Sequence, residues 1–189
     1  LGGEINDFTF EYPCHSPEKE HWFLLQVTSL KNDEGGAVVS HIDISDRKKN
    51  EAKLKNSEEF ARTIFESSPD SVIVLETDGR MHSINSTGLR LMEIDDFASL
   101  AGKNWVDFWE DDEKKIAVNA IKQAFEGKSV SFEGFRRTVK GTPKWWDVTV
   151  APIFNDQGNT TLLVSNSREI TDRKKAETEL KNSEEFARS

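Results

Sequence analysis

A 19-residue segment occurs twice in the chain, at positions 126 apart. Residues 44–62 read ISDRKKNEAKLKNSEEFAR and residues 170–188 read ITDRKKAETELKNSEEFAR, so 15 of the 19 positions are identical. Both copies are dominated by charged residues, and neither Gly nor Pro occurs from Asp46 to Ser67, which predicts a helix with Ser45 as its N-cap. A charged helix that recurs after one domain length is typical of a connector in an array of domains.

The segments before the two connectors share one layout. Residues 5–12, 21–30 and 36–44 are rich in β-branched and aromatic residues and predict three strands, with a turn at 32–36. A similar series precedes the second connector, at 129–139, 144–154 and 160–170, and Trp22 corresponds there to Trp145. We therefore expect residues 1–44 to be the last three strands of a domain whose beginning is absent. Three antiparallel strands alone would leave one apolar face uncovered.

One complete domain is expected between the connectors. It should begin with strands at 71–77 and 80–85, joined by a tight turn, and continue through short helices at 86–94 and 95–103 and an aromatic turn at 104–109. The longest helix is expected at 111–127, with its acids in the first turn and Ile116, Ala120 and Ala124 or Phe125 on one face. The predicted division is a truncated domain at 1–44, a connector helix at 45–66, a complete domain at 67–170 and a second connector at 171–189.

Composition limits the class of protein. The formal charge is 25 − 34 = −9, the wrong sign for binding nucleic acid or anionic lipid through a basic face. Twelve Phe and five Trp residues are enough to form a packed core. No apolar run approaches the roughly 18–20 residues that cross a bilayer, so we expect a cytoplasmic protein, or the cytoplasmic part of a receptor whose anchor lies outside this sequence. The chain opens on Leu and stops within a connector, which indicates a fragment.

The two domain ends share one motif, Glu169-Ile170-Thr171-Asp172-Arg173 and Asp43-Ile44-Ser45-Asp46-Arg47. Further motifs are Ser68-Pro69-Asp70, the segment 75–80, Asn85 and the turn 155–158. With these motifs, the element order resembles the PAS domain with its C-terminal PAC motif. The resemblance implies an α+β fold, a five-stranded antiparallel sheet in the order 2-1-5-4-3 with short helices on one face. It also implies a sensory or dimerisation role in multi-domain receptors such as histidine kinases, cyclic-dinucleotide enzymes or chemoreceptors.

The resemblance also implies a signal-relay site at each domain end. The closing acid, Asp43 in the first copy and Glu169 in the second, is expected to pair with a base at the start of the following helix. Arg47 and Arg173 are the local bases, and Asp172 lies beside the second. Such a pair would fix the angle at which the helix leaves the sheet, so that a ligand shifting the last strand could tilt the helix. The alternative is a surface ion pair that contributes roughly 0–1 kcal/mol.

Two cofactors of this family are disfavoured by residue type. A photoactive flavin needs a Cys in the helical half of the domain, and Cys14 lies elsewhere. Haem needs an axial ligand, usually a His on the long helix, and residues 111–127 contain none. The spacing of His15, His21 and His41 around Cys14 matches no zinc pattern, so no metal site is expected. The cofactor therefore stays unidentified.

The resemblance places an ordinary ligand pocket between sheet and helices. Its candidate residues are Met92, Trp105, Phe108, Trp109, Phe125, Phe132, Phe135, Trp146 and Val148 as apolar wall, with Thr149, Ser165 and Asn166 as polar contacts. Arg136 or Arg137 could meet a carboxylate if turned inward. The alternative is that these aromatic residues simply fill the core.

Motifs of catalysis are absent from the sequence, which contains no phosphate-binding Gly-rich loop, nucleophile elbow or His-Glu-x-x-His. We expect a non-catalytic segment of a protein that is itself a histidine kinase or diguanylate cyclase. Two functions remain open. One is a sensory module that binds a small molecule, forms a homodimer through its connector helices and signals to an effector domain elsewhere in the same chain, in a two-component type of system. The other is a ligand-free dimerisation and spacer module.

Overall fold

The computed structural model describes residues 7–16, 19–30 and 36–188. The chain divides into two compact units, residues 1–62 and 63–189, and each is considered by itself. The first two residues of the strand expected at 5–12 lie outside the described residues, and so does the turn expected at 32–36 apart from Gly36. In the part of the chain that is described, none of the helices is both long and apolar enough to cross a membrane.

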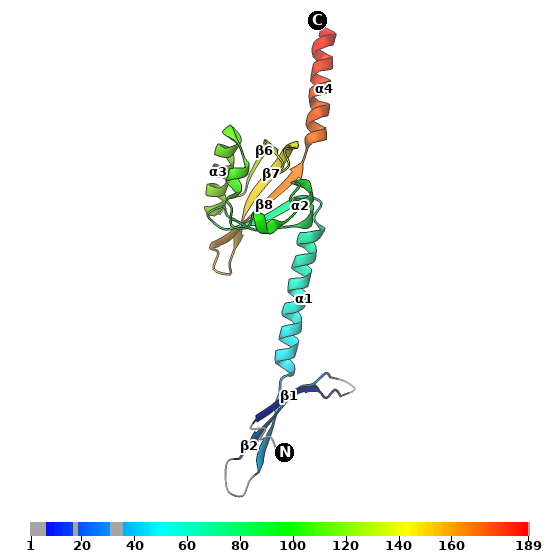
Figure 1. Cartoon of the computed structure of the whole chain (residues 1–189), viewed down its shortest axis with the longest axis vertical. Helices are drawn as coiled ribbons and strands as arrows, with labels where there is room; N and C mark the ends of the chain where they lie inside the picture. The colour runs from blue at the N-terminus through cyan, green and yellow to red at the C-terminus, as the bar shows by residue number, and fades with distance from the viewer. Residues whose placement is uncertain (1–6, 17–18, 31–35, 189) are drawn as a thin grey trace. The chain divides into compact units, whose positions relative to one another are not determined.

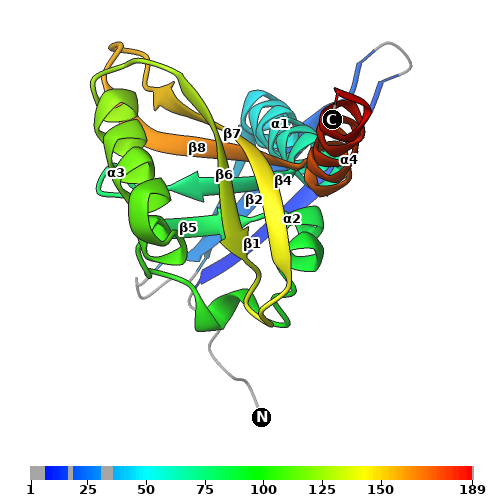
Figure 2. The same cartoon turned by 90° about the horizontal axis from the view of Figure 1, so that it is seen from above.

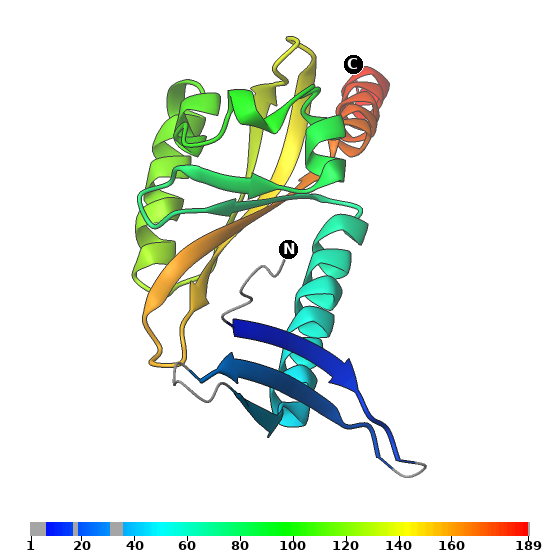
Figure 3. The same ribbon diagram turned by 60° about the horizontal axis from the view of Figure 1, so that its bottom comes forward.

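The first unit contains a three-stranded antiparallel sheet (Figure 3). Its strands are β1 (Asp7–Pro13), β2 (Trp22–Ser29) and β3 (Ala37–Asp43), with β2 in the centre. Several large apolar side chains of this sheet are exposed, including Phe10 at 55% and Val39 at 56%. The exposed apolar side chains agree with the uncovered face that three isolated strands would have.

Helix α1 (Ser45–Ser67) follows β3 directly. Its first turn differs from the expected capping: the Ser45 hydroxyl accepts a hydrogen bond from the Trp22 N–H at 3.0 Å, and the Ile44 carbonyl accepts from the Lys48 N–H. Ser45 thus connects the start of the helix to β2 and is not a conventional N-cap. No side chain of α1 is buried, and Leu54, Phe60 and Ile64 are all more than half exposed.

The second unit is built on a five-stranded antiparallel sheet in the order β5-β4-β8-β7-β6. Numbered within this sheet alone, the order is 2-1-5-4-3. The strands are β4 (Ser71–Leu75), β5 (Met81–Ile84), β6 (Val130–Arg137), β7 (Pro143–Phe154) and β8 (Thr160–Glu169). Four helical segments lie between β5 and β6: α2 (Ser86–Leu91), the 3-10 turns η1 (Phe97–Ser99) and η2 (Trp105–Phe108), and α3 (Asp111–Phe125). Figure 2 shows α3 lying along one side of the sheet, and Figure 1 shows α4 (Thr171–Arg188) continuing from the end of β8.

The core lies between the helices and one face of this sheet. Because side chains alternate along a strand, Trp146, Val148 and Val150 of β7 share the inner face with Ser165 and Leu163 of β8, and all five are fully buried. Strands β4 and β5 add Ile73, Leu75, Met81 and Ile84, and the helical side contributes Met92, Leu100, Trp105, Trp109, Ala117, Ala120, Ile121 and Ala124. Three buried tryptophans therefore fill much of the space between the layers.

The packed face of helix α3 includes Ala120 and Ala124, as expected, but is rotated away from Ile116 and Phe125. Its buried residues are Ala117, Ala120, Ile121 and Ala124, at the i, i+3, i+4 and i+7 spacing of one helical face. Ile116 and Phe125 are 41% and 55% exposed, so the two largest members of the expected face lie at the surface. Because alanine is small, these residues allow the helix to approach the sheet closely. The sequence-based prediction gave more weight to the bulky residues Ile116 and Phe125.

Candidate functional site

The most unusual residue of the core is Arg136, whose side chain is 2% exposed. It lies near the end of β6 on the inner face, where its guanidinium carbon is 4.6 Å from the ring centre of Trp109 and 5.1 Å from that of Trp146. These cation–π contacts partly compensate the loss of hydration. Burial still lowers the pKa of Arg136 to about 9, so the side chain remains cationic at neutral pH.

The hydrogen bonding of Arg136 is incomplete. Its Nη2 donates to the thioether sulfur of Met92 at 3.1 Å, which is a weak acceptor, and its Nε has no partner among the described residues. The side chain borders a cavity of about 10 Å³, lined also by Met92, Trp105 and Phe108 together with aliphatic residues of β4, β5 and the α2–η2 region. A volume of this size holds about one water molecule.

Gly134 allows the aromatic ring of Trp109 to reach this site. A Cβ atom at Gly134 would lie 2.6 Å from Cζ3 of Trp109, far inside contact distance. The ring of Trp109 also packs edge-on against Trp105 and Phe132, with ring centres 5.6 and 5.3 Å away. The position beneath Arg136 is thus fixed by tight packing.

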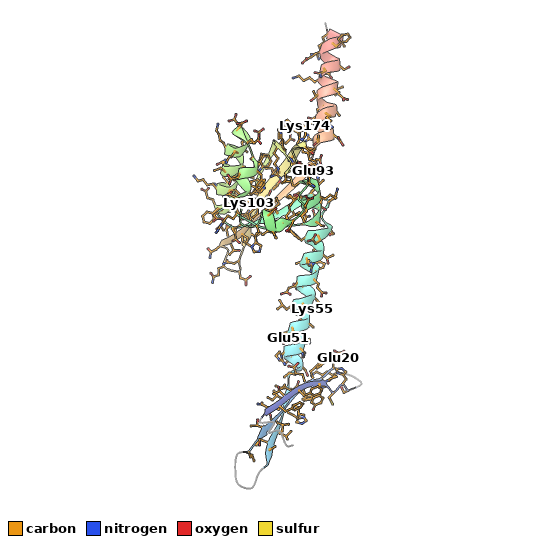
Figure 4. All side chains as sticks on the ribbon, viewed as in Figure 1. Glu20, Glu51, Lys55, Glu93, Lys103 and Lys174 are labelled. Carbon is orange, nitrogen blue, oxygen red and sulfur yellow. The ribbon has the colours of Figure 1, made fainter. Side chains whose placement is uncertain are left out.

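A polar cluster holds the Met92 segment against the β6–β7 turn. The carboxylate of Glu93, labelled in Figure 4, accepts hydrogen bonds from the hydroxyls of Thr138 and Thr142, and these bonds lower the pKa of Glu93. The Met92 carbonyl accepts from the Val139 N–H at 3.1 Å. Glu93 adopts a φ of 57°, an uncommon value for a residue other than glycine. These contacts hold the backbone next to Met92, one of the residues that line the cavity beside Arg136.

The structure brings most of the predicted pocket residues to the inner face. Met92, Trp105, Phe108 and Arg136 line the cavity itself, and Trp109 and Trp146 contact the Arg136 guanidinium. Val148 and Ser165 are fully buried on the same face, and Phe132 packs against the core. These residues therefore lie together on one face, while their role as the wall of a ligand pocket stays a prediction.

Four predicted pocket residues lie elsewhere. Thr149 and Asn166 are paired across β7 and β8 on the outer face, and Phe135 also faces outward, where it contacts Trp145. The reason is strand alternation: Thr149 follows Val148, Asn166 follows Ser165 and Phe135 precedes Arg136, so neighbours cannot share a face. Phe125 lies at the exposed end of α3.

A second site lies where β8 passes into α4. The Ile170 N–H donates to the Trp145 carbonyl, and the Thr171 hydroxyl accepts from the Trp145 N–H at 3.1 Å. On the outer face of β6, Glu133 pairs with Arg173 at 2.6 Å and with Lys174 at 2.5 Å. The hydrogen bonds from Lys174 and Arg173 lower the pKa of Glu133. Lys174, labelled in Figure 4, also lies over the Trp145 ring at 5.4 Å.

The junction between β3 and α1 repeats this arrangement. The Ile44 N–H donates to the Trp22 carbonyl, and Glu11 pairs with Arg47 at 2.5 Å and with Lys48 at 2.7 Å. Lys48 lies 5.3 Å from the centre of the Trp22 ring. Both junctions thus use one strand acid, two helix bases and one tryptophan.

The expected relay pairs are not formed as proposed from the sequence. Arg47 pairs with Glu11 and Glu51, while the Asp43 carboxylate accepts from the backbone N–H and hydroxyl of Ser45.

In the second junction Glu169 pairs with Lys144 at 2.8 Å. Glu169 lies opposite Trp146 and so faces inward, whereas Arg173 reaches Glu133 on the outer face, which separates the two side chains. Asp172 is fully exposed. The acids that do pair with these helix bases, Glu11 and Glu133, were not predicted from the sequence, although the identical Arg-Lys pair in both connectors was a visible signal.

The entry of the chain into the sheet is held by Asn85, which is fully buried at the N-cap of α2. Its side-chain oxygen accepts from the N–H groups of Val72 and Gly88, and its side-chain nitrogen donates to the carbonyls of Phe65 and Asp70. One amide therefore connects the last turn of α1 to β4 and α2, with all four of its hydrogen bonds made.

This sheet, its helical cover and its outgoing helix match a known family. The sequence model of the family described as PAS fold matches residues 65–175, which is more than half of the chain. The chain belongs to the PAS fold family. A PAS domain of an HTR-like protein from Haloarcula marismortui has the same fold, with a TM-score of 0.55 and 20% identity, covering 65% of this chain and 99% of that structure.

Two curated proteins are similar in sequence. The chain is 28% identical to sporulation kinase E of Bacillus subtilis over 162 residues, which is 85% of this chain. It is 47% identical over 45 residues, 24% of its length, to an uncharacterized 104.1 kDa protein of Rhodobacter capsulatus. The chain spans only 21% and 5% of the lengths of these relatives. The PAS domain is thus similar in sequence to a region of sporulation kinase E.

Proposed function

We propose that this chain is a non-catalytic regulatory PAS module that binds a small molecule in the core of residues 67–170 and relays that event through α4 to an effector domain of the same protein. The observation that carries the proposal is the junction of β7, β8 and α4. Trp145, whose backbone fixes Ile170 and Thr171, is adjacent in sequence to Trp146, whose ring contacts the Arg136 guanidinium. A shift of β7 at the core is therefore transmitted to the first turn of α4 within one residue.

The incoming side supports the same relay. Asn85 holds the end of α1 to β4, and the carboxylate of Asp70, just before β4, pairs with Arg168 near the end of β8. The chain enters and leaves the sheet through residues that contact one another. Two helices coupled to adjacent strands could pass a tilt from one domain of an array to the next.

The first unit fits the proposal as the C-terminal part of a preceding PAS domain with a PAC-type ending. Its support is the repeated junction, in which Glu11, Trp22 and Lys48 take the places of Glu133, Trp145 and Lys174. Tandem domains joined by near-identical connectors would transmit the same movement through two junctions of the same structure.

Hydrogen exchange tests the relay. A metabolite library is screened by thermal shift on the 189-residue chain, and amide exchange of residues 171–188 is then compared with and without each compound that stabilises it. We expect altered exchange in the first turn of α4. Thr171→Val, which removes the acceptor of the Trp145 N–H, should reduce this response without preventing binding. A compound that binds the core and leaves α4 unchanged would contradict the relay.

A second function is favoured by a different observation. The cavity beside Arg136 measures only about 10 Å³, and buried tryptophans fill much of the remaining interior, as expected of a ligand-free dimerisation and spacer module. Leu54 and Phe60 of α1 are 62% and 69% exposed, and their counterparts Leu180 and Phe186 of α4 are 64% and 86% exposed.

We propose that Leu54 of α1 and Leu180 of α4 lie in the contact of a homodimer through the connector helices. Leu54→Glu combined with Leu180→Glu should dissociate the dimer in sedimentation experiments, whereas Ile116→Glu on the exposed side of α3 should not. A wild-type chain that sediments as a monomer at high concentration would contradict the dimer.

A further inference from the structure

We propose that Arg136 is the anchor of a binding site for a small carboxylate in the interior of this PAS domain. The inference rests on the sensory function proposed above and names the chemical class of the ligand. It is carried by the geometry of the guanidinium and of the groups around it.

The first step is the charge. Arg136 is 2% exposed, and within the described part of the chain no carboxylate forms an ion pair with it. Isolated buried charges are strongly disfavoured, and buried arginines are normally paired with an acid. The faces of Trp109 and Trp146 offset part of this cost, because aromatic rings attract cations. A bound anion would supply the missing counter-charge.

The second step is the edge that is left open. A guanidinium binds a carboxylate side-on through Nε and Nη2, which donate two parallel hydrogen bonds. Arg168 of the same domain does this with Asp70, at 3.1 and 2.9 Å. In Arg136 the same two atoms have only the Met92 sulfur, bound to Nη2, while Nε is unpartnered among the described residues. Along this Nε–Nη2 edge of Arg136, the weak acceptor Met92 is therefore the one partner among the described residues.

The third step is the space. The cavity that this residue borders has a volume of about 10 Å³ and is otherwise lined by apolar side chains, among them Met92, Trp105 and Phe108. A carboxylate needs more room, so Met92 has to move from Nη2. The methionine side chain is flexible, and the hydrogen bond that its sulfur accepts from Arg136 is weak, so this displacement is feasible. The apolar lining favours a ligand with one carboxylate and a small apolar body.

The fourth step links occupancy to the cavity wall. Met92 precedes Glu93, whose hydrogen bonds to Thr138 and Thr142 close the segment against the β6–β7 turn. Displacement of Met92 would disturb these hydrogen bonds of Glu93. Binding at Arg136 would shift Trp146, whose ring contacts the guanidinium, and with it Trp145, whose backbone holds the start of α4.

Thermal shift and tryptophan fluorescence test the inference. The probes are the sodium salts of acetate, pyruvate, succinate and benzoate, with sodium chloride at equal ionic strength and acetamide as an uncharged analogue of acetate. At least one carboxylate should raise the Tm of the wild-type chain by several degrees and change its tryptophan emission, whereas chloride and acetamide should not.

Three variants separate binding from structure. Arg136→Met retains the length of the side chain and removes the charge, so carboxylate affinity should fall at least about thirty-fold, while the unliganded protein should be no less stable because a buried unpaired charge is gone. Arg136→Lys retains a charge without the two parallel donors and should bind about tenfold more weakly than wild type. Arg137→Gln alters the adjacent exposed residue and should bind as wild type does.

The outcomes are distinct. If no carboxylate shifts the wild-type chain, or if Arg136→Met or Arg136→Lys responds as wild type does, the inference is overturned. Loss of stability in Arg136→Met with an unchanged carboxylate response would make Arg136 a structural residue only. An uncharged compound that binds and alters α4 exchange would leave the sensor function standing without this site. Arg136-dependent carboxylate binding with unchanged α4 exchange would leave the site standing without the relay.

Discussion

Arg168 binds the carboxylate of Asp70 through two hydrogen bonds, from Nε to Oδ1 at 3.1 Å and from Nη2 to Oδ2 at 2.9 Å. Asp70 lies immediately before β4, and Arg168 lies one residue before the end of β8. The pair therefore joins the point where the chain enters the five-stranded sheet to the point where it leaves. The Asp70 side chain is 13% exposed and that of Arg168 is 66% exposed. Removal of Arg168 therefore leaves a nearly buried carboxylate unpaired, whereas removal of Asp70 leaves a guanidinium that is largely in solvent.

Removal of Arg168 should be more harmful than removal of an ordinary surface arginine. Arg168→Gln leaves the nearly buried Asp70 carboxylate without its bidentate partner, which is costly for a buried acceptor. We expect the Tm to fall by a few degrees and amide exchange to increase at the start of α4. Arg80→Gln is the control, because Arg80 and its partner Asp78 are both more than half exposed. Equal effects of the two substitutions would show that the pair contributes no more than a surface contact.

Asn85 should tolerate no charged isostere. Asn85→Asp retains the oxygen that accepts from Val72 and Gly88 but replaces the nitrogen that donates to the carbonyls of Phe65 and Asp70. A carboxylate facing two carbonyls without donors should lower the free energy of unfolding by about 2–4 kcal/mol. Urea denaturation followed by tryptophan fluorescence measures this. Asn159→Asp in an exposed turn should stay within about 0.5 kcal/mol of the wild type.

The regular elements were predictable because their signals are local. The alternation of apolar residues in β6, β7 and β8 and the turn residues between them placed the strands within about two residues. The five-stranded sheet and the helices between β5 and β6 followed from the family resemblance, and PAS membership is now shown. The interpretation of residues 1–44 as part of another PAS domain stays a prediction.

The contacts of the candidate sites were not predictable in the same way. Arg136 and Arg137 are adjacent, so one had to face inward, but only the register of β6 against β7 decides which. Glu133 and Arg173 are 40 residues apart, and their pairing depends on how α4 leaves β8. The sequence-based prediction therefore took Glu169, the closing acid that the family resemblance implies, and it also assigned Thr149 and Val148 to one pocket although strand alternation separates them.

Gly134 should be needed for the packing beneath Arg136. A Cβ atom at this position would lie 2.6 Å from Trp109, whose ring is 1% exposed and also packs against Trp105 and Phe132. Gly134→Ala should therefore lower the free energy of unfolding by about 1–3 kcal/mol and alter the emission of Trp109. Ser131→Ala, at an exposed position of the same strand, is the control and should have little effect. A fully stable Gly134→Ala protein would mean that the Trp109 ring can move without loss.

The junction of β6 and α4 should loosen in acid. Lys174 and Arg173 lower the pKa of Glu133 below its ordinary value of 4.5, so the folded chain binds a proton at Glu133 less readily than the unfolded chain does. The stabilisation from this acid is therefore fully present above about pH 4.5 and is lost as the pH falls through the lower, folded value.

NMR titration of the side-chain carboxyl carbons measures this directly. Glu133 should titrate with a midpoint below 4.5, and the amides of residues 171–175 should shift over the same range because the ion pairs to α4 are released. In Glu133→Gln the part of that second shift that follows the midpoint of Glu133 should disappear, while Glu179→Gln, on the exposed part of α4, should retain it. If the amides of residues 171–175 respond to acid in the same way with and without the Glu133 carboxylate, the attachment of α4 to β6 does not depend on this residue.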